Sequence, residues 1–174
     1  TAAVFLNQNS PAYLGGITNG RWEALPAGDG FWVFSDPSDP NYVYSESQGG
    51  YLSRINRTTL AARDIQPKAR SGEKLRFNWN TPIHVSPNVK GKIYIGSQFL
   101  FASTDHGQSW QRISPDLTTN DPVKQRQEES GGITVDNSAA EMHTTIYSIS
   151  ESPKDANTIW AGTDDGNIQL TRDG

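Results

Sequence analysis

Three segments of the chain repeat one pattern of marker residues. In each segment a β-branched residue stands four positions before a proline, an aromatic residue follows the proline by seven positions, and a Ser or Thr stands three positions further on. The three sets are Val33, Pro37, Tyr44 and Ser47; Ile83, Pro87, Tyr94 and Ser97; and Ile149, Pro153, Trp160 and Thr163. Every marker is offset by 50 residues between the first two sets and by 66 between the last two. Such a repeat predicts supersecondary units that stack on one another.

Each repeat contains short runs with the alternation of apolar and polar residues that is typical of half-buried β-strands. The predicted strands cover 30–35, 42–46, 51–55 and 60–65 in the first repeat, 82–86, 92–97, 100–104 and 109–113 in the second, and 145–150, 157–162 and 167–171 in the third. Three earlier strands are expected over 2–6, 13–18 and 21–25, the last two joined by a tight turn at Asn19-Gly20.

Four strands in a period of this length are typical of the blades of a β-propeller. The predicted fold class is therefore all-β, with four-stranded antiparallel blades that form a partial propeller of about three to four blades. The chain is expected to be one propeller segment, with a partial blade at 1–26, blades at 31–66 and 81–114, and an incomplete blade at 144–174.

The stretch from residue 103 to 110, Ser-Thr-Asp-His-Gly-Gln-Ser-Trp, has the composition of a turn between two strands. Asp105 can accept hydrogen bonds from nearby backbone N–H groups, Gly107 tolerates a positive φ, and the Ser103 hydroxyl can tie down the strand end. We expect Trp110 to fold back over the turn and His106 to face solvent without a role. A structural role is favoured over a chemical one, because each polar group has a local partner.

The pattern Ser/Thr-x-Asp-x-Gly-x-x-Trp in this stretch resembles the Asp-box of bacterial-neuraminidase-type repeats. The matching residues are Ser103, Asp105, Gly107 and Trp110, and Thr171 and Asp173 match the beginning of a second box. The chain is similar to the Asp-box propellers of sortilin-type receptors, of xyloglucan-cleaving glycoside hydrolases and of large secreted bacterial proteins. This resemblance implies a propeller fold and an extracellular or periplasmic location. The three-arginine clamp of sialidases has no counterpart in the sequence.

Composition narrows the function classes. The net charge of −4 gives no electrostatic support for binding nucleic acid or an anionic membrane, and no run approaches the roughly 18 apolar residues of a membrane span. The absence of cysteine excludes disulfides, thiolate chemistry and cysteine-ligated zinc. No cofactor is expected.

Candidate ligand-binding residues lie in the links between blades, because long loops on a rigid scaffold tend to carry function. The links are 26–30, 67–80 and 115–143, and the candidates are Arg76, Asn78, Trp79, His84, Glu141 and His143. A cation beside an indole can bind a sugar face or a peptide carboxylate; alternatively, Trp79 fills the gap between two blades. His84 is more often a polar lining residue than a base.

Metal binding and catalysis lack a complete set of residues. Glu141 and His143 would supply two metal ligands, but the sequence offers no third, so no metal is expected. Glycoside hydrolysis needs two carboxyl groups about 5–10 Å apart, and the sequence does not show which of Asp36, Asp116, Asp136 and Glu141 would pair.

Two functions remain open: a propeller module that binds a peptide or a glycan, and a glycoside hydrolase that acts on a β-glucan or xyloglucan-type polysaccharide. Closed propellers need about 4–8 blades. The sequence begins at Thr1 and stops at Gly174 inside a box. We therefore expect further blades, in the same or an associated chain, and exposed apolar surface on the end blades.

Overall fold

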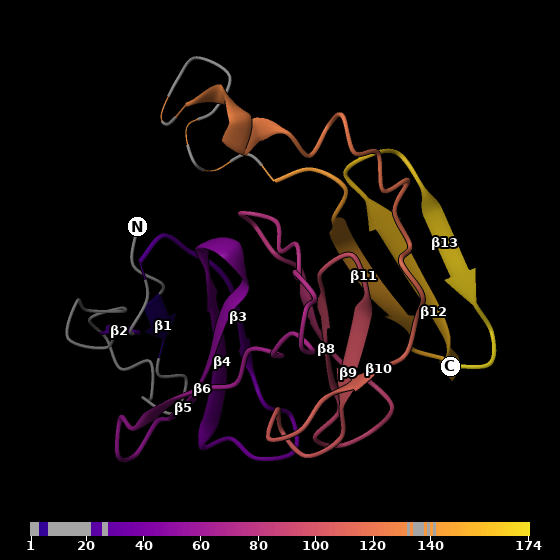
Figure 1. Cartoon of the computed structure of the whole chain (residues 1–174). Coiled ribbons are helices and arrows are strands. Elements are labelled where there is room, and N and C mark those ends of the chain that lie inside the picture. Colours follow the sequence, from indigo (N-terminus) through magenta and orange to yellow (C-terminus); the bar gives the residue numbers. More distant parts are fainter. Residues whose placement is uncertain are drawn as a thin grey trace, which may run out of the picture.

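The computed structural model describes residues 4–6, 22–25, 28–131, 133, 138, 140 and 142–174. It is an all-β structure of antiparallel sheets that stand side by side (Figure 1). The described residues contain no α-helix, only the short 3-10 turns η2 (Gln48–Gly50) and η3 (Gln127–Ser130). Among the described residues, no helix is long and apolar enough to cross a membrane. The predicted all-β class with four-stranded antiparallel sheets is confirmed.

Three sheets correspond to the three repeats. Sheet 1 has the order β3 (Gly30–Ser35), β4 (Tyr42–Ser47), β5 (Tyr51–Asn56) and β6 (Ala62–Asp64). Sheet 2 has the order β7 (Ile83–Val85), β8 (Ile93–Gly96), β9 (Leu100–Ser103) and β10 (Gln111–Arg112). Sheet 3 contains β11 (Ile146–Ser152), β12 (Asp155–Thr163) and β13 (Ile168–Thr171). In each sheet, neighbouring strands follow one another in sequence.

A separate pair of strands precedes sheet 1. Strand β1 (Val4–Leu6) pairs with β2 (Trp22–Ala24) in antiparallel register. The strand expected over 13–18 and the turn at Asn19-Gly20 lie outside the described residues.

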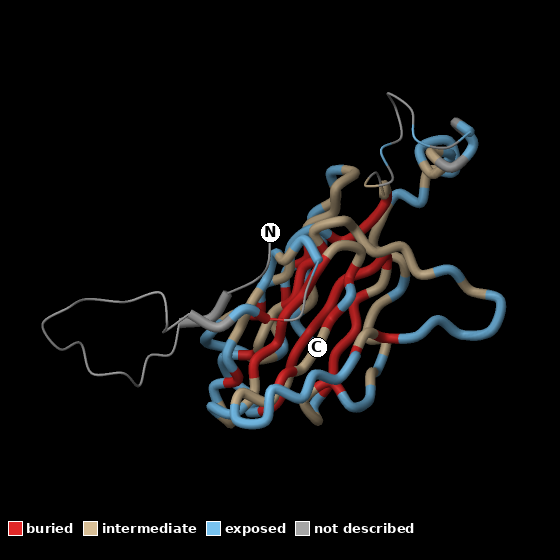
Figure 2. Tube along the Cα trace, turned by 90° about the vertical axis from the view of Figure 1, so that its left-hand side faces the viewer, coloured by how far each residue is buried: buried red, intermediate tan, exposed pale blue. Residues whose placement is uncertain are grey.

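Alternating side chains along the second strand of each sheet build the core between sheets. On β4, Val43 packs with Leu25 and Ile55, whereas its neighbour Tyr44 packs toward sheet 2. The cluster between sheets 1 and 2 consists of Tyr44, Leu52, Ile65, Ile83, Ile93, Ile95 and Phe101. The cluster between sheets 2 and 3 consists of Tyr94, Leu100, Ala102, Ile146, Ile159 and Ala161. Figure 2 shows these buried strands as the interior of the stack, with exposed turns around them.

The face of sheet 3 that points away from sheet 2 carries exposed apolar side chains. Trp160 pairs with Leu170 across β12 and β13, and both are exposed, as is Ile168. Their sequence neighbours Ile159 and Ala161 are buried against sheet 2. The uncovered apolar surface expected on an end blade is therefore present on sheet 3.

The turn from 103 to 110 closes on itself through hydrogen bonds. The Ser103 hydroxyl accepts from the Gly107 N–H (2.8 Å) and donates to Asp105 Oδ1 (2.7 Å). Asp105 also accepts from the N–H and hydroxyl of Ser109 (2.9 and 2.6 Å), and these bonds, led by the Ser109 hydroxyl, lower its pKa to about 2. Thr171 and Asp173 make the same hydroxyl-to-carboxylate bond (2.5 Å).

Two side chains of this turn make contacts with sheet 1 that the sequence did not predict. The Trp110 indole N–H donates to the Ile65 carbonyl (2.6 Å). His106, expected in solvent, places Nδ1 2.6 Å from Asp36 Oδ2. The φ of 60° at His106 turns the ring toward the neighbouring sheet, and Gly107 (φ 80°) continues this left-handed stretch.

Candidate functional site

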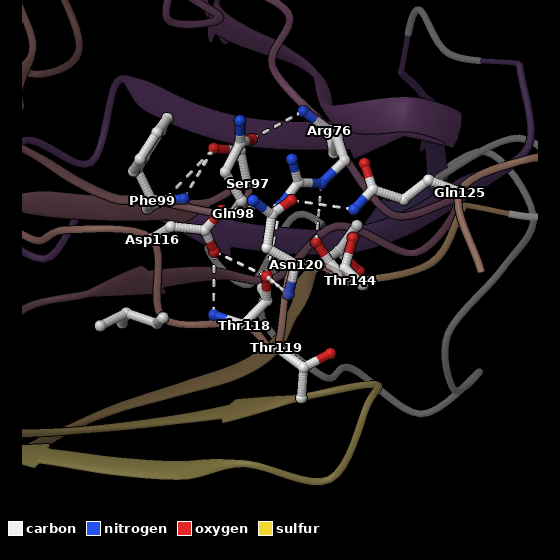
Figure 3. Close-up of polar contacts among 12 residues, drawn as sticks. Arg76, Ser97, Gln98, Phe99, Asp116, Thr118, Thr119, Asn120, Gln125 and Thr144 are labelled. Atoms are coloured by element: carbon white, nitrogen blue, oxygen red, sulfur yellow. Dashed lines mark hydrogen bonds and ion pairs between the residues drawn. The ribbon is translucent and has the colours of Figure 1, made fainter. Parts of the chain in front are cut away.

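The links that follow β6 and β10 meet at one end of the sheets, the upper end in Figure 1. Arg76 is the centre of their contact (Figure 3). Its guanidinium donates to Asp116 Oδ2 (2.8 Å), to Thr118 Oγ1 (3.2 Å) and to the Thr144 carbonyl (3.0 Å). The Arg76 N–H donates to the Gln98 side chain (2.8 Å). Arg76 therefore joins sheets 2 and 3 and uses much of its hydrogen-bonding capacity within the protein.

Asn78 makes a second contact between the same two sheets. Its amide group donates to Thr145 Oγ1 (3.0 Å) and Asp164 Oδ2 (3.3 Å). Asp164 in turn accepts from the Thr145 N–H and hydroxyl (2.9 and 2.7 Å). These contacts hold the end of β12 against the link that precedes sheet 2.

The other candidate residues lie apart from this network. Trp79 is half-buried, and its carbonyl accepts from the Gly49 N–H (3.0 Å). His84 on β7 accepts from the Glu151 N–H (3.2 Å); burial lowers its pKa, against the opposing charge of Glu151. His143 has a buried Nδ1 without a hydrogen-bond partner in the described part of the chain. Glu141 lies outside the described residues.

The two candidate carboxylates that the structure describes, Asp36 and Asp116, are not brought together by any contact. Asp116 is held by Arg76, whereas Asp36 binds Tyr44 and His106 between sheets 1 and 2. Asp136, like Glu141, lies outside the described residues. Among the described residues, no group of three or more His, Asp or Glu side chains is placed to hold a metal ion.

A glutamate that sequence reasoning missed lies at the same end of sheet 1. Glu46 on β4 is 0% exposed, and neither carboxylate oxygen makes a hydrogen bond within the described structure. Burial raises its pKa to about 8. The backbone N–H groups of Trp32, Gly50 and Thr81 oppose this shift but lie outside hydrogen-bond geometry. Burial therefore favours the protonated form of Glu46.

A β-bulge stands opposite Glu46. Gly30 pairs with Ser47 and Val33 pairs with Ser45, so Phe31 and Trp32 together face the single residue Glu46 on β4. The extra residue changes the direction of the side chains, as bulges beside functional sites commonly do. Phe31 and Trp32 are each 39% exposed. We call this pair the Phe31–Trp32 bulge.

Packing fixes the orientation of the Trp32 ring. It stacks on Phe34 with ring centroids 5.9 Å apart and an interplanar angle of 6°. Phe34 itself packs against the core between sheets 1 and 2. The result is a rigid, partly exposed indole beside a buried, protonated carboxyl group.

The repeat itself carried a signal for Glu46. The equivalent positions in the other two repeats are Gly96 and Gly162, offset by the same 50 and 66 residues. A Cβ on Gly96 would lie 2.8 Å from Ile146, so sheet 2 has no space for a side chain at this position. The repeat has glycine at this core-facing position in sheets 2 and 3 and an ionisable residue in sheet 1. Core packing alone does not explain a glutamate there.

Comparison with known proteins places the fold but not a family. No family model and no curated protein matches the sequence. Among solved structures, the GH74 xyloglucanase from Xanthomonas campestris matches with a TM-score of 0.54 and 14% identity, over 87% of this chain and 22% of that chain. An ancestral GH74 enzyme matches with a TM-score of 0.38 and 17% identity, over 84% of this chain and 23% of that chain. The chain thus spans about a fifth of these propeller enzymes, and the first likeness shows a shared fold alone.

Proposed function

We propose that sheets 1, 2 and 3 are consecutive blades of a β-propeller. Each sheet packs its face on the next, and its strands run in sequence order from one edge to the other. The likeness to part of a GH74 xyloglucanase supports this arrangement. Further blades, in the same polypeptide or an associated chain, would cover the exposed face of sheet 3 around Trp160 and Leu170.

The function that the geometry supports best is binding of a β-glucan or xyloglucan-type polysaccharide at the Phe31–Trp32 bulge. The observation that carries this proposal is the exposed Trp32 ring, held parallel to Phe34 beside the buried Glu46. A rigid aromatic face suits the apolar face of a sugar ring and loses little entropy on binding. An extracellular or periplasmic location is proposed with it, because such polysaccharides lie outside the cell.

A glycan is favoured over a peptide as the ligand. The sequence offered Arg76 as the partner of a peptide carboxylate, but its guanidinium is held by Asp116, Thr118 and Thr144. Breaking this partly buried network to bind a ligand would leave Asp116 without its ion pair. The bulge, in contrast, presents aromatic surface without any rearrangement.

The test is binding of a xyloglucan oligosaccharide, measured by titration calorimetry. Trp32→Ala is expected to weaken binding roughly tenfold, because a stacking surface is lost. Tyr147→Ala is the matched control. Tyr147 is exposed (49%) in the corresponding bulge of sheet 3, where Gly162 takes the place of Glu46. Equal losses in both variants, or binding that Trp32→Ala leaves unchanged, would contradict the proposed site.

Hydrolysis of the same polysaccharide is the second candidate function, supported by the likeness to a xyloglucanase. A protonated Glu46 has the state that a general acid requires. No described contact places a second carboxyl group beside it, so binding is favoured. A reducing-end assay on xyloglucan decides between the two: turnover that is lost in Glu46→Gln or Asp116→Asn would identify a hydrolase.

A further inference from the structure

A pocket of about 350 Å³ lies between the outer strands of sheets 1 and 2. Its base is formed by buried residues, among them Ile65 and Phe101, and Trp110 forms part of its wall. The wall is fixed, because the Trp110 indole is bonded to the Ile65 carbonyl (2.6 Å) and a Cβ on Gly107 would lie 2.4 Å from Ile65 Cδ1. The volume is at the lower end of the range for small-molecule sites.

The rim of this pocket is basic, although the chain is acidic overall. Arg63, Lys68, Arg70 and Arg112 contribute to the lining, against the single acid Asp64. Lys68 is neutralised by Asp64 (2.7 Å), and Arg112 by Glu73 (2.5 Å). Within the described structure, the side chains of Arg63 and Arg70 make no hydrogen bond or ion pair. The Arg70 N–H donates to Glu73 Oε2 (3.3 Å), and the pKa of Glu73 is lowered first by its hydrogen bond to Arg112 and also by the charge of Arg70.

The position of Arg63 is unfavourable without a counter-charge. It stands directly opposite Arg54 across β5 and β6, and two like charges at such a position destabilise a sheet. Arg54 is compensated, since it donates to the His106 carbonyl (3.0 Å) and lies over the Tyr42 ring (4.8 Å). Arg63 lacks any such partner in the described part of the chain. Of the three arginines that line the pocket, Arg63 and Arg70 are therefore the two whose guanidinium groups have no hydrogen bond or ion pair in the described structure.

We propose that this pocket binds an anionic sugar residue, a uronate whose carboxylate lies between Arg63 and Arg70. Guanidinium groups bind carboxylates through paired, charge-assisted hydrogen bonds. The apolar base and the Trp110 wall suit the body of a sugar ring. The pocket lies at the outer edge of sheet 1, at β6, whereas the Phe31–Trp32 bulge lies on β3 at the opposite edge. The two sites are therefore tested by different variants.

An acidic peptide is a weaker fit to the same charges. An extended peptide would bind here by adding a strand to the exposed edges, and main-chain hydrogen bonds would supply its affinity. The edges beside the pocket are β6, with three residues, and β10, with two. Such short edges give little support to an added strand. The pocket instead matches a compact group with one negative charge.

Titration with tetragalacturonate tests the proposal. Binding is expected at 50 mM NaCl and is expected to weaken at 300 mM, because the contact depends on charge. Arg63→Gln and Arg70→Gln are each expected to reduce affinity roughly tenfold. Lys154→Gln removes the same charge from an exposed turn of sheet 3 and is expected to have no effect.

Three results would overturn the proposal. The first is that tetragalacturonate does not bind, and the second is that its affinity is unchanged in the double variant Arg63→Gln/Arg70→Gln. The third is that Lys154→Gln reduces the affinity as much as the pocket variants do. A tetraglutamate peptide that binds as tightly as tetragalacturonate, with the same dependence on Arg63, would replace the sugar with an acidic peptide. Circular dichroism and thermal unfolding of each variant show whether its fold is intact.

Discussion

The buried acids of the sheet interfaces fall into two groups. Asp36 and Glu151 are surrounded by donors. Glu151 accepts from Tyr94 (2.5 Å), Ser86 (2.7 Å) and Asn88 (2.6 Å). Glu46, equally buried, has no hydrogen-bond partner in the described structure.

The pKa values follow this difference. Burial alone would raise the pKa of Asp36 and Glu151, but their hydrogen bonds outweigh it, so that Asp36 reaches about 2 and Glu151 is lowered. Burial without such bonds raises the pKa of Glu46 to about 8. We infer that the hydrogen-bonded acids Asp36 and Glu151 hold the sheets together. Glu46, which lacks such bonds and lies beside the exposed Phe31–Trp32 bulge, is inferred to contact a ligand.

Removing a hydrogen-bonded buried acid is expected to have the largest effect on the free energy of unfolding. Glu151→Ala leaves the buried hydroxyl groups of Tyr94 and Ser86, and the amide of Asn88, without their acceptor. The free energy of unfolding should fall by roughly 3 kcal/mol, because several buried polar groups lose their partner at once. Urea denaturation measures it. Glu129→Ala, in an exposed ion pair with Arg126, is the control and should cost little. Equal costs would remove the distinction between the two groups of acids.

The ionised form of Glu46 is expected to lower the stability of the fold, whereas the ionised forms of Glu151 and Asp36 contribute to it. The pKa of Glu46 is raised in the folded state from 4.5 to about 8, so the folded protein binds the extra proton. Stability should therefore fall as the pH rises from 4.5 to 8, by a few kcal/mol at most. Glu46→Gln should abolish this fall. Urea denaturation between pH 5 and pH 8 measures it, and an unchanged slope in the variant would contradict the role of Glu46.

Asp36 provides the internal control for this pH dependence. Its folded-state pKa is lowered from 3.8 to about 2, so its contribution is complete above pH 3.8 and is lost as the pH falls through 2. The two acids thus act in separate pH ranges.

Asp105→Ala should have an intermediate effect. Asp105 holds the turn that places His106 and Trp110 against sheet 1. Its loss should cost about 1–3 kcal/mol of unfolding free energy, because the Ser109 N–H and hydroxyl lose their acceptor. Thermal or urea unfolding measures this cost. Xyloglucan oligosaccharide binding should persist, since the turn lies at the other end of the sheets from the links. A stable variant that no longer binds would reverse this assignment of ends.

Trp110→Phe should have the smallest effect. It keeps an aromatic ring against the core but removes the N–H bonded to the Ile65 carbonyl. A single neutral hydrogen bond is worth about 1 kcal/mol. Urea denaturation checks the value; a loss comparable to that of Glu151→Ala would show that the indole itself, and not its hydrogen bond, joins sheets 1 and 2.

The fold was predictable because its determinants are local. The spacing of proline, aromatic and hydroxyl residues places β3, β4, β7, β8, β11 and β12 to within a few residues. The site depends on contacts across the sequence. Arg76 meets partners 40 and 68 residues away, and the turn from 103 to 110 meets Asp36 only after sheets 1 and 2 stack. The strand pattern predicted a strand over 42–46, but it showed neither the burial of Glu46 nor the bulge that places Phe31 and Trp32 opposite it.

The most direct test of the Phe31–Trp32 bulge follows the indole N–H resonances of the five tryptophans by NMR during titration with a xyloglucan oligosaccharide. The Trp32 resonance is expected to shift, because its ring is exposed beside Glu46. The Trp110 resonance should stay in place, because its N–H is bonded to Ile65. Saturable binding that leaves the Trp32 resonance unmoved, or no binding at all, would contradict the assignment of the glycan site to this bulge.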